Sequence, residues 1–112
     1  VHAGLPPDGT MDAGPGGRDP RLWIREEFLR SDSDFGGRTV VHGHTPYRDG
    51  RPVIEETRIG IDTGAAYGGP LTAVALAPGV AGSASVAAVF QAFPRGVRSA
   101  TSTDGSQRYA GR

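Results

Sequence analysis

The chain has 112 residues, which is enough for one domain and no more. Its 12 basic and 12 acidic residues cancel, so net charge favours neither a nucleic acid nor a membrane surface as a partner. Cysteine is absent, which excludes disulfides and thiol catalysis. Because no signal peptide or membrane span is visible, the sequence predicts a cytoplasmic protein and leaves its oligomeric state open.

The first 30 residues combine a histidine, a loop and a helix signal. His2 stands between an apolar residue and small residues, as at the end of a strand. Residues 6–18 are rich in Pro, Gly and Asp and are typical of a loop. Asp19 as N-cap and Pro20 as first helical residue predict one helix that runs to about Leu29. On that helix, Arg25 would emerge from an apolar arc.

The middle of the chain predicts short strands joined by turns. Residues 31–37 are a connector, and a strand over residues 38–43 is stopped just after its histidines by Pro46. Since side chains alternate along a strand, His42 and His44 are expected on the same side of the sheet. An Asp-Gly pair at residues 49–50 indicates a tight turn, residues 58–62 alternate as a strand, and residues 63–70 form a small-residue loop.

The last part of the sequence divides into a hairpin and a tail. Two apolar runs, residues 71–77 and 85–93, are joined by a turn rich in Pro, Gly and Ser, and they predict an antiparallel hairpin. Residues 95–112 contain too little apolar material to pack, so they are predicted to be disordered. The folded unit is therefore expected to comprise residues 1–94.

Three kinds of side chain in these segments suit phosphate or metal chemistry. Neutral imidazole is a common metal ligand, although a histidine at a strand end can equally be hydrogen-bonded or exposed. The planar guanidinium of Arg25 suits a phosphoryl group, the alternative being a surface arginine lying over apolar neighbours. Asp62 follows an apolar strand and is either a carboxylate ligand or a structural residue.

Six stretches within roughly the first 77 residues follow one another in a specific order: Val1-His2-Ala3-Gly4-Leu5, residues 22–29 (LWIREEFL), Asp34-Phe35-Gly36, residues 40–46 (VVHGHTP), Ile61-Asp62-Thr63-Gly64-Ala65 and residues 69–74 (GPLTAV). Together they resemble the C-terminal half of a bacterial serine/threonine protein phosphatase of the calcineurin-like metallophosphoesterase superfamily. The resemblance implies an α/β fold in which residues 1–94 form the C-terminal portion of a β-sandwich flanked by helices. The resemblance further implies that the N-terminal half of that domain is missing from this chain.

The same resemblance implies a function and a site. The parent enzyme hydrolyses phosphoserine or phosphothreonine in a phosphoprotein, using water activated by two divalent ions, manganese first and iron or zinc as alternatives. His2 and His44 would bind a metal, and Arg25 would bind the phosphoryl oxygens. His42, Asp62 and Tyr67 are expected behind the ligands or at the substrate mouth. Because the remaining ligands belong to the missing half, this chain alone is expected to be inactive.

Two other functions remain open on the sequence. Symmetrical diadenosine tetraphosphatases share the Gly-His-Thr-Pro and Asp-Thr-Gly-Ala signals found at residues 43–46 and 62–65. A catalytically inactive, truncated module that binds a metal or a partner would carry the same residues.

Overall fold

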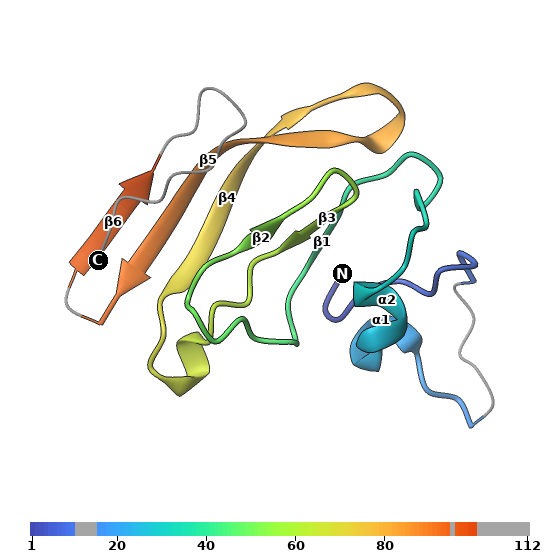
Figure 1. Cartoon of the computed structure of the whole chain (residues 1–112), viewed down its shortest axis with the longest axis horizontal. Helices are drawn as coiled ribbons and strands as arrows, with labels where there is room; N and C mark the ends of the chain where they lie inside the picture. Colours follow the sequence, from blue (N-terminus) through green and yellow to red (C-terminus); the bar gives the residue numbers. More distant parts are fainter. Residues whose placement is uncertain (11–15, 95, 101–112) are drawn as a thin grey trace.

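The computed structural model describes residues 1–10, 16–94 and, for the backbone alone, 96–100. These residues form a small α/β unit with two three-stranded sheets, which confirms the fold class at that level (Figure 1). The elements in chain order are α1 (Pro20–Trp23), α2 (Glu26–Leu29), β1 (Val40–His42), β2 (Val53–Ile54), β3 (Arg58–Gly60), the 3-10 helix η1 (Ala65–Tyr67), β4 (Leu71–Pro78), the 3-10 helix η2 (Val80–Gly82), β5 (Ala84–Phe93) and β6 (Gly96–Ala100).

The first sheet has the order β1-β3-β2 and carries the histidines. Strand β1 pairs with β3 in parallel, with Val41 opposite Ile59, and β2 pairs with β3 antiparallel. The other edge of β1 is also hydrogen-bonded, because the Val1 amino group donates to the Val41 carbonyl at 3.0 Å and the Gly43 amide donates to the His2 carbonyl at 2.8 Å. The first two residues therefore lie alongside β1.

The single helix expected from Asp19 to Leu29 is wrong, because the chain breaks it into α1 and α2. Its start is confirmed: the Asp19 carboxylate accepts from the Arg21 amide at 3.0 Å, and Pro20 is the first helical residue. The break falls at Ile24, whose ψ of 142° is extended, so Arg25 becomes the residue before α2. The argument that placed Arg25 on a helical arc fails for that reason.

The break brings Phe28 into the centre of the core. Phe28 is fully buried against Leu5, Phe35 and Val40, and its ring lies so close to the Gly4 backbone that a Cβ there would collide with it. A continuous helix from Pro20 would have aimed this face elsewhere, since side chains on one face recur only every three or four residues. The break in the helix therefore accompanies the complete burial of Phe28.

Arg58 on β3 fastens α2 to the first sheet. Its Nη1 donates to the carbonyls of Phe28 and Ser31 at 2.7 and 2.9 Å, at the C-terminal end of α2, where carbonyls lack the partners of a continuing helix. The guanidinium also pairs with Glu55 at 2.6 Å and lies 5.8 Å from the centre of the Phe28 ring. One side chain thus joins the helix, the core and the sheet.

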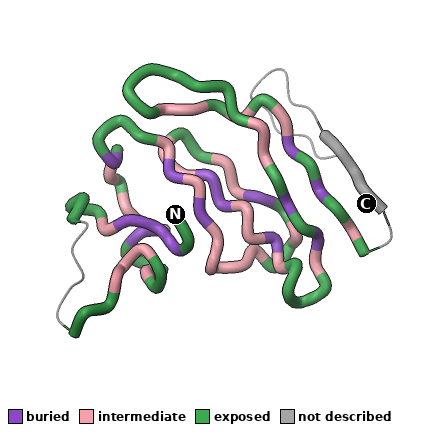
Figure 2. The backbone as a smooth tube through the Cα atoms, turned by 180° about the vertical axis from the view of Figure 1, so that it is seen from behind, coloured by how far each residue is buried: buried purple, intermediate pink, exposed green. Residues whose placement is uncertain are grey.

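The second sheet has the order β4-β5-β6 and confirms the predicted hairpin. Thr72 faces Gln91 across the hairpin and both are buried, whereas Leu71 and Phe90 are 65% and 42% exposed. Along most of β5, exposed positions alternate with buried or half-buried ones (Figure 2). No charged residue occurs between Thr63 and Pro94. One face of the β4-β5 hairpin therefore presents apolar side chains to the surface with no charge among them.

Strand β6 lies within the segment that the sequence analysis assigned to a disordered tail. Its residues Gly96–Ala100 pair antiparallel with β5, with Val97 opposite Ala92. The rest of that prediction, residue 95 and residues 101–112, lies outside the described residues, as do residues 11–15 of the predicted loop. Within the described part of the chain, no helix has the length and apolar character needed to cross a membrane.

Replacing Arg58 by Met should destabilise the protein by roughly 2 kcal/mol, because two buried carbonyls lose a charged donor. Urea unfolding followed by circular dichroism measures the change. Arg30→Met is the matched control, since Arg30 pairs with Glu26 but its side chain is 82% exposed, and it should cost no more than about 0.5 kcal/mol. Equal losses in the two variants would contradict the role given to Arg58.

Candidate functional site

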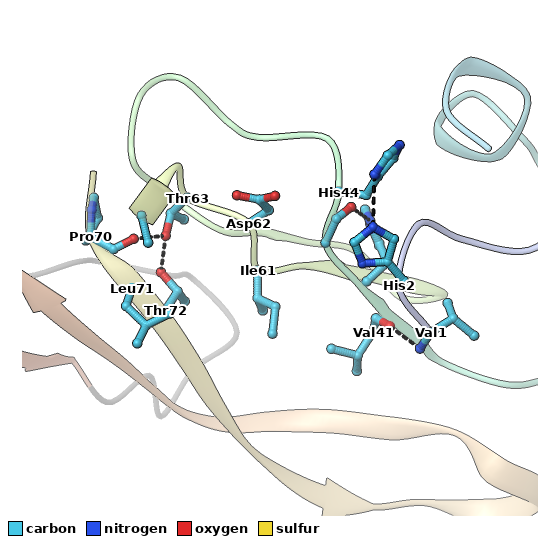
Figure 3. Close-up of a pocket in the computed structure, with 13 residues that line it drawn as sticks. Val1, His2, Val41, His44, Ile61, Asp62, Thr63, Pro70, Leu71 and Thr72 are labelled. Atoms are coloured by element: carbon cyan, nitrogen blue, oxygen red, sulfur yellow. Dashed lines mark hydrogen bonds between the residues drawn. The ribbon is translucent and has the colours of Figure 1, made fainter. Parts of the chain in front are cut away.

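His2 and His44 meet at the end of β1. The Nε2 atom of His2 lies 3.0 Å from Nδ1 of His44, and the ring centres are 4.8 Å apart (Figure 3). The two nitrogens share one hydrogen bond, whose donor depends on which ring carries the proton. Residues that are 42 positions apart in the chain are thus brought together by the pairing of the first residues with β1.

The backbone at His44 is unusual. Its φ is +68°, and the Thr45 amide donates to the Gly43 carbonyl at 2.8 Å, which closes a three-residue turn around the histidine. Such a turn with positive φ at its centre is the rare and strained form of the γ-turn. Strained backbone of this kind is concentrated at functional sites, where it aims a side chain that the regular strand would direct elsewhere.

The far nitrogen of the His44 ring has no partner among the described residues. Nε2 is buried and makes no hydrogen bond, an arrangement that costs free energy unless another group reaches it. Burial lowers the pKa of His44, and the positive charge of Arg25 lowers it further, against an opposing effect of Asp62. Both causes keep the imidazole neutral, which is the form that binds metals.

The spacing of the two histidine nitrogens fits adjacent positions around a metal ion. Metal–nitrogen bonds of 2.0–2.1 Å at a right angle place two ligand atoms about 3.0 Å apart, and tetrahedral angles place them about 3.4 Å apart. The observed 3.0 Å matches the first arrangement. His2 and His44 could therefore hold one ion at a similar spacing once the shared proton leaves and the rings turn both lone pairs towards the ion.

A cleft of about 940 Å³ contains five of the six residues that the sequence analysis singled out: His2, Arg25, His44, Asp62 and Tyr67. Arg25 reaches it from the break between α1 and α2, with its Nη1 3.5 Å from the Thr45 hydroxyl. That distance is at the limit of a hydrogen bond, so the N–H groups of the exposed Arg25 guanidinium are available to donate to a ligand. The helix break places Arg25 at the cleft.

Asp62 and Tyr67 enter the cleft from the loop that follows β3. One carboxylate oxygen of Asp62 accepts from the Gly64 amide at 3.1 Å, a turn that a short acidic side chain commonly makes. Among the described residues, no three His, Cys, Asp or Glu side chains gather closely enough to hold a metal ion, so Asp62 does not complete a ligand set there. Tyr67, on η1, is 85% exposed.

His42 has different neighbours from the other two histidines. Its ring is 2% exposed and packs edge-on against Phe28, with ring centres 4.7 Å apart. Its Nδ1 lies 3.4 Å from the Gly43 carbonyl, a long contact. Burial is the main cause that lowers the pKa of His42, and the nearby Arg58 adds to it. His42 borders a smaller cavity of about 340 Å³ that also touches His2 and His44.

The cleft also holds residues that the sequence analysis did not select. Tyr47 and Arg48 line it from the loop after Pro46. Trp23 does not line the cleft, but its ring stands edge-on to the His44 ring, with ring centres 6.0 Å apart. The signal for Arg48 was weak, because an arginine before Asp-Gly is ordinary in an exposed turn. That Arg48 lines the cleft becomes visible only in the folded structure, where this loop packs against β3.

No protein-family model matches the chain, and neither a curated protein nor a solved structure shows significant similarity to it.

Acid should destabilise the protein through His42. Because its pKa is lowered in the folded state, the unfolded chain binds more protons below about pH 6.5, so stability falls as the pH drops through that value and is flat above it. His42→Phe, which keeps a ring against Phe28, should flatten this dependence. Urea midpoints between pH 7.5 and 5.5, with a chelator present, measure both proteins. The same slope in the variant would show that another group is responsible, and His44, whose pKa shifts in the same direction, would be the next to test.

Proposed function

We propose that this chain contributes to the site of a metal-dependent phosphomonoester hydrolase that acts on phosphoserine or phosphothreonine in proteins. The observation that carries the proposal is the meeting of His2 Nε2 and His44 Nδ1 at 3.0 Å in a cleft that also contains Arg25. A pair of metal-ligand atoms and a phosphate-binding side chain thus face one space. The order of sequence motifs around them, which resembles the calcineurin-like phosphatases, supports the same function.

The charge of the cleft supports an anionic ligand. Arg25 and Arg48 line it with two positive charges, against one negative charge from Asp62. The His44 pKa is lowered, so that ring adds no positive charge near neutral pH. A phosphoryl group entering the cleft would therefore find an excess of positive charge even before a metal ion adds its own.

Each residue has a task in this proposal. His2 and His44 hold a metal ion through the two nitrogens that face each other, and Asp62 fixes the turn beside them through the Gly64 amide. Arg25 binds and orients the phosphoryl oxygens with paired hydrogen bonds and stabilises their charge as it develops. Divalent ions, when bound, lower the pKa of a coordinated water and neutralise the phosphate, manganese being the ion that the resemblance favours.

Two histidines are too few ligands for such a centre. Structural and catalytic sites use at least three protein ligands for a zinc ion, and paired sites use more. Among the residues that the structure describes, no further acidic or histidine side chain joins the two. The proposal therefore requires ligands from outside the described residues.

Zinc titration tests the ligand assignment directly. Zn²⁺ should shift the imidazole ¹⁵N resonances of His2 and His44 together, because both rings bind the same ion, while His42 should shift less. His44→Ala should remove most of the affinity, since a single histidine is left, whereas His42→Phe should change it by less than about tenfold. Stronger binding loss in His42→Phe than in His44→Ala would show that the two roles are exchanged.

Arg25→Ala should lower kcat/KM for p-nitrophenyl phosphate by about 100-fold or more in the complete enzyme, because a charge-stabilising donor is lost. At a pH well above 6.5, where His44 is neutral with or without Arg25, the Zn²⁺ titration of the variant should be nearly unchanged, since Arg25 contacts no metal ligand directly. Arg25→Lys should fall between the two, as it keeps the charge and loses the paired geometry. An Arg25→Ala protein that loses metal and recovers full activity at saturating metal would give Arg25 a structural role.

A further inference from the structure

We propose that Arg48 is a second anion-binding residue, and that the ligand of the cleft is a phosphoryl compound with another anionic group close to its phosphoryl group. This inference rests on the proposed function, because it assigns the phosphoryl group itself to Arg25. Arg25 and Arg48 line the same cleft from different segments of the chain, the break between the helices and the turn after Pro46.

The turn that carries Arg48 is fixed on both sides. The Tyr47 amide donates to the Asp62 carbonyl at 2.9 Å, and the Tyr47 ring packs so closely on Gly60 that a Cβ there would collide with it. The Gly50 amide donates to the Tyr47 carbonyl at 3.1 Å, and the Gly50 carbonyl accepts from Gln91 at 2.8 Å. A ligand would therefore find the backbone of Arg48 already ordered, which lowers the entropic cost of binding.

The Arg48 guanidinium is also free to bind. Within the described residues it makes no hydrogen bond and no ion pair, whereas Arg21, Arg30 and Arg58 all have carboxylate partners within 2.7 Å. An arginine that is exposed, unpaired and held at the edge of a cleft suits a ligand anion, because its planar donors match carboxylate and phosphate geometry. Among the residues that line the cleft, Asp62 is the one acidic side chain that could accept hydrogen bonds from Arg48.

The size of the cleft limits where the second anion lies. A sphere of 940 Å³ is about 12 Å across, and Arg48 follows Thr45, which Arg25 contacts, by only three residues. Three residues span at most about 10 Å along the backbone, and both arginines line this one cleft. A second anionic group bound in the cleft therefore lies within about the width of the cleft from the first, close enough for an adjacent phosphoryl group or for an acidic side chain next to a phosphorylated residue.

Binding of simple anions tests the inference without any need for turnover. Inorganic phosphate and pyrophosphate would be titrated into the chain at low ionic strength, with affinities taken from backbone and arginine side-chain NMR shifts. Arg48→Gln should weaken pyrophosphate up to about fivefold, the range of an exposed charge pair, and leave phosphate nearly unchanged. Arg51→Gln is the matched control, because Arg51 follows the same turn and does not line the cleft. It should leave both affinities as they are.

A phosphoseryl peptide distinguishes the source of the second anion. Peptides with Glu or with Gln beside the phosphoserine would be compared, and a Glu preference that Arg48→Gln removes would identify an acidic side chain. A preference confined to pyrophosphate would identify a second phosphoryl group. Either result supports the role of Arg48.

Three outcomes would contradict the role of Arg48 or the role of Arg25, and the experiments distinguish them from one another. If Arg48→Gln changes neither the pyrophosphate nor the Glu preference, or changes them no more than Arg51→Gln does, Arg48 is not a second anion site. If Arg25→Gln leaves phosphate binding intact, the phosphoryl assignment fails while Arg48 is judged on its own data. If neither anion binds at millimolar concentration, both the anion-binding cleft and the role of Arg48 are overturned.

Discussion

Hydrogen bonding along both edges of β1 is the constraint on which the site depends. On one edge the Gly43 amide donates to the His2 carbonyl, and on the other the Ile61 amide donates to the His42 carbonyl at 2.9 Å. Because β1 and β3 are parallel, the loops that follow them leave the sheet at the same end, where the carboxyl ends of both strands lie. Open α/β sheets bind their ligands at this end, since the loops after parallel strands converge there. Backbone pairing therefore brings His2, His44 and Asp62 to one place independently of contacts between their side chains.

The second sheet supports this edge with polar contacts instead of charges. The Thr63 hydroxyl lies 2.6 Å from the Pro70 carbonyl and from the Thr72 hydroxyl, and Gln91 donates to Thr72 at 3.0 Å. These buried groups satisfy one another, which they must, because an unpaired polar group inside a protein is costly. Since Gln91 also holds the Gly50 carbonyl, the same cluster anchors both loops of the cleft to the hairpin. The uncharged β4-β5 hairpin can thus hold a charged site in place.

Local sequence signals predicted the parts of this structure that depend on near neighbours. The cap at Asp19, the hairpin after residue 70 and the strand before the histidines follow from short patterns, and all three are present. The helix break was missed, because it accompanies the burial of Phe28 against Leu5 and Phe35, which lie outside the segment for which the helix was predicted. The turn at His44 was missed as well, since a positive φ at a non-glycine residue has no dependable sequence signal. Arg48 was missed for the same kind of reason, as its place in the cleft depends on packing between Tyr47 and Gly60.

The electrostatics of the cleft couple the two halves of the proposed chemistry. Burial and the charge of Arg25 lower the pKa of His44, so the group that would attract a phosphoryl anion also keeps a ligand imidazole free of its proton. A bound anion would partly cancel the charge of Arg25 and so weaken this effect on His44. A metal ion on the His44 nitrogen would remove this dependence, because a coordinated nitrogen cannot be protonated at the same time. A metal ion and a phosphoryl group would then favour each other through their opposite charges, while Asp62, which raises the pKa of His44, limits how far Arg25 depresses it.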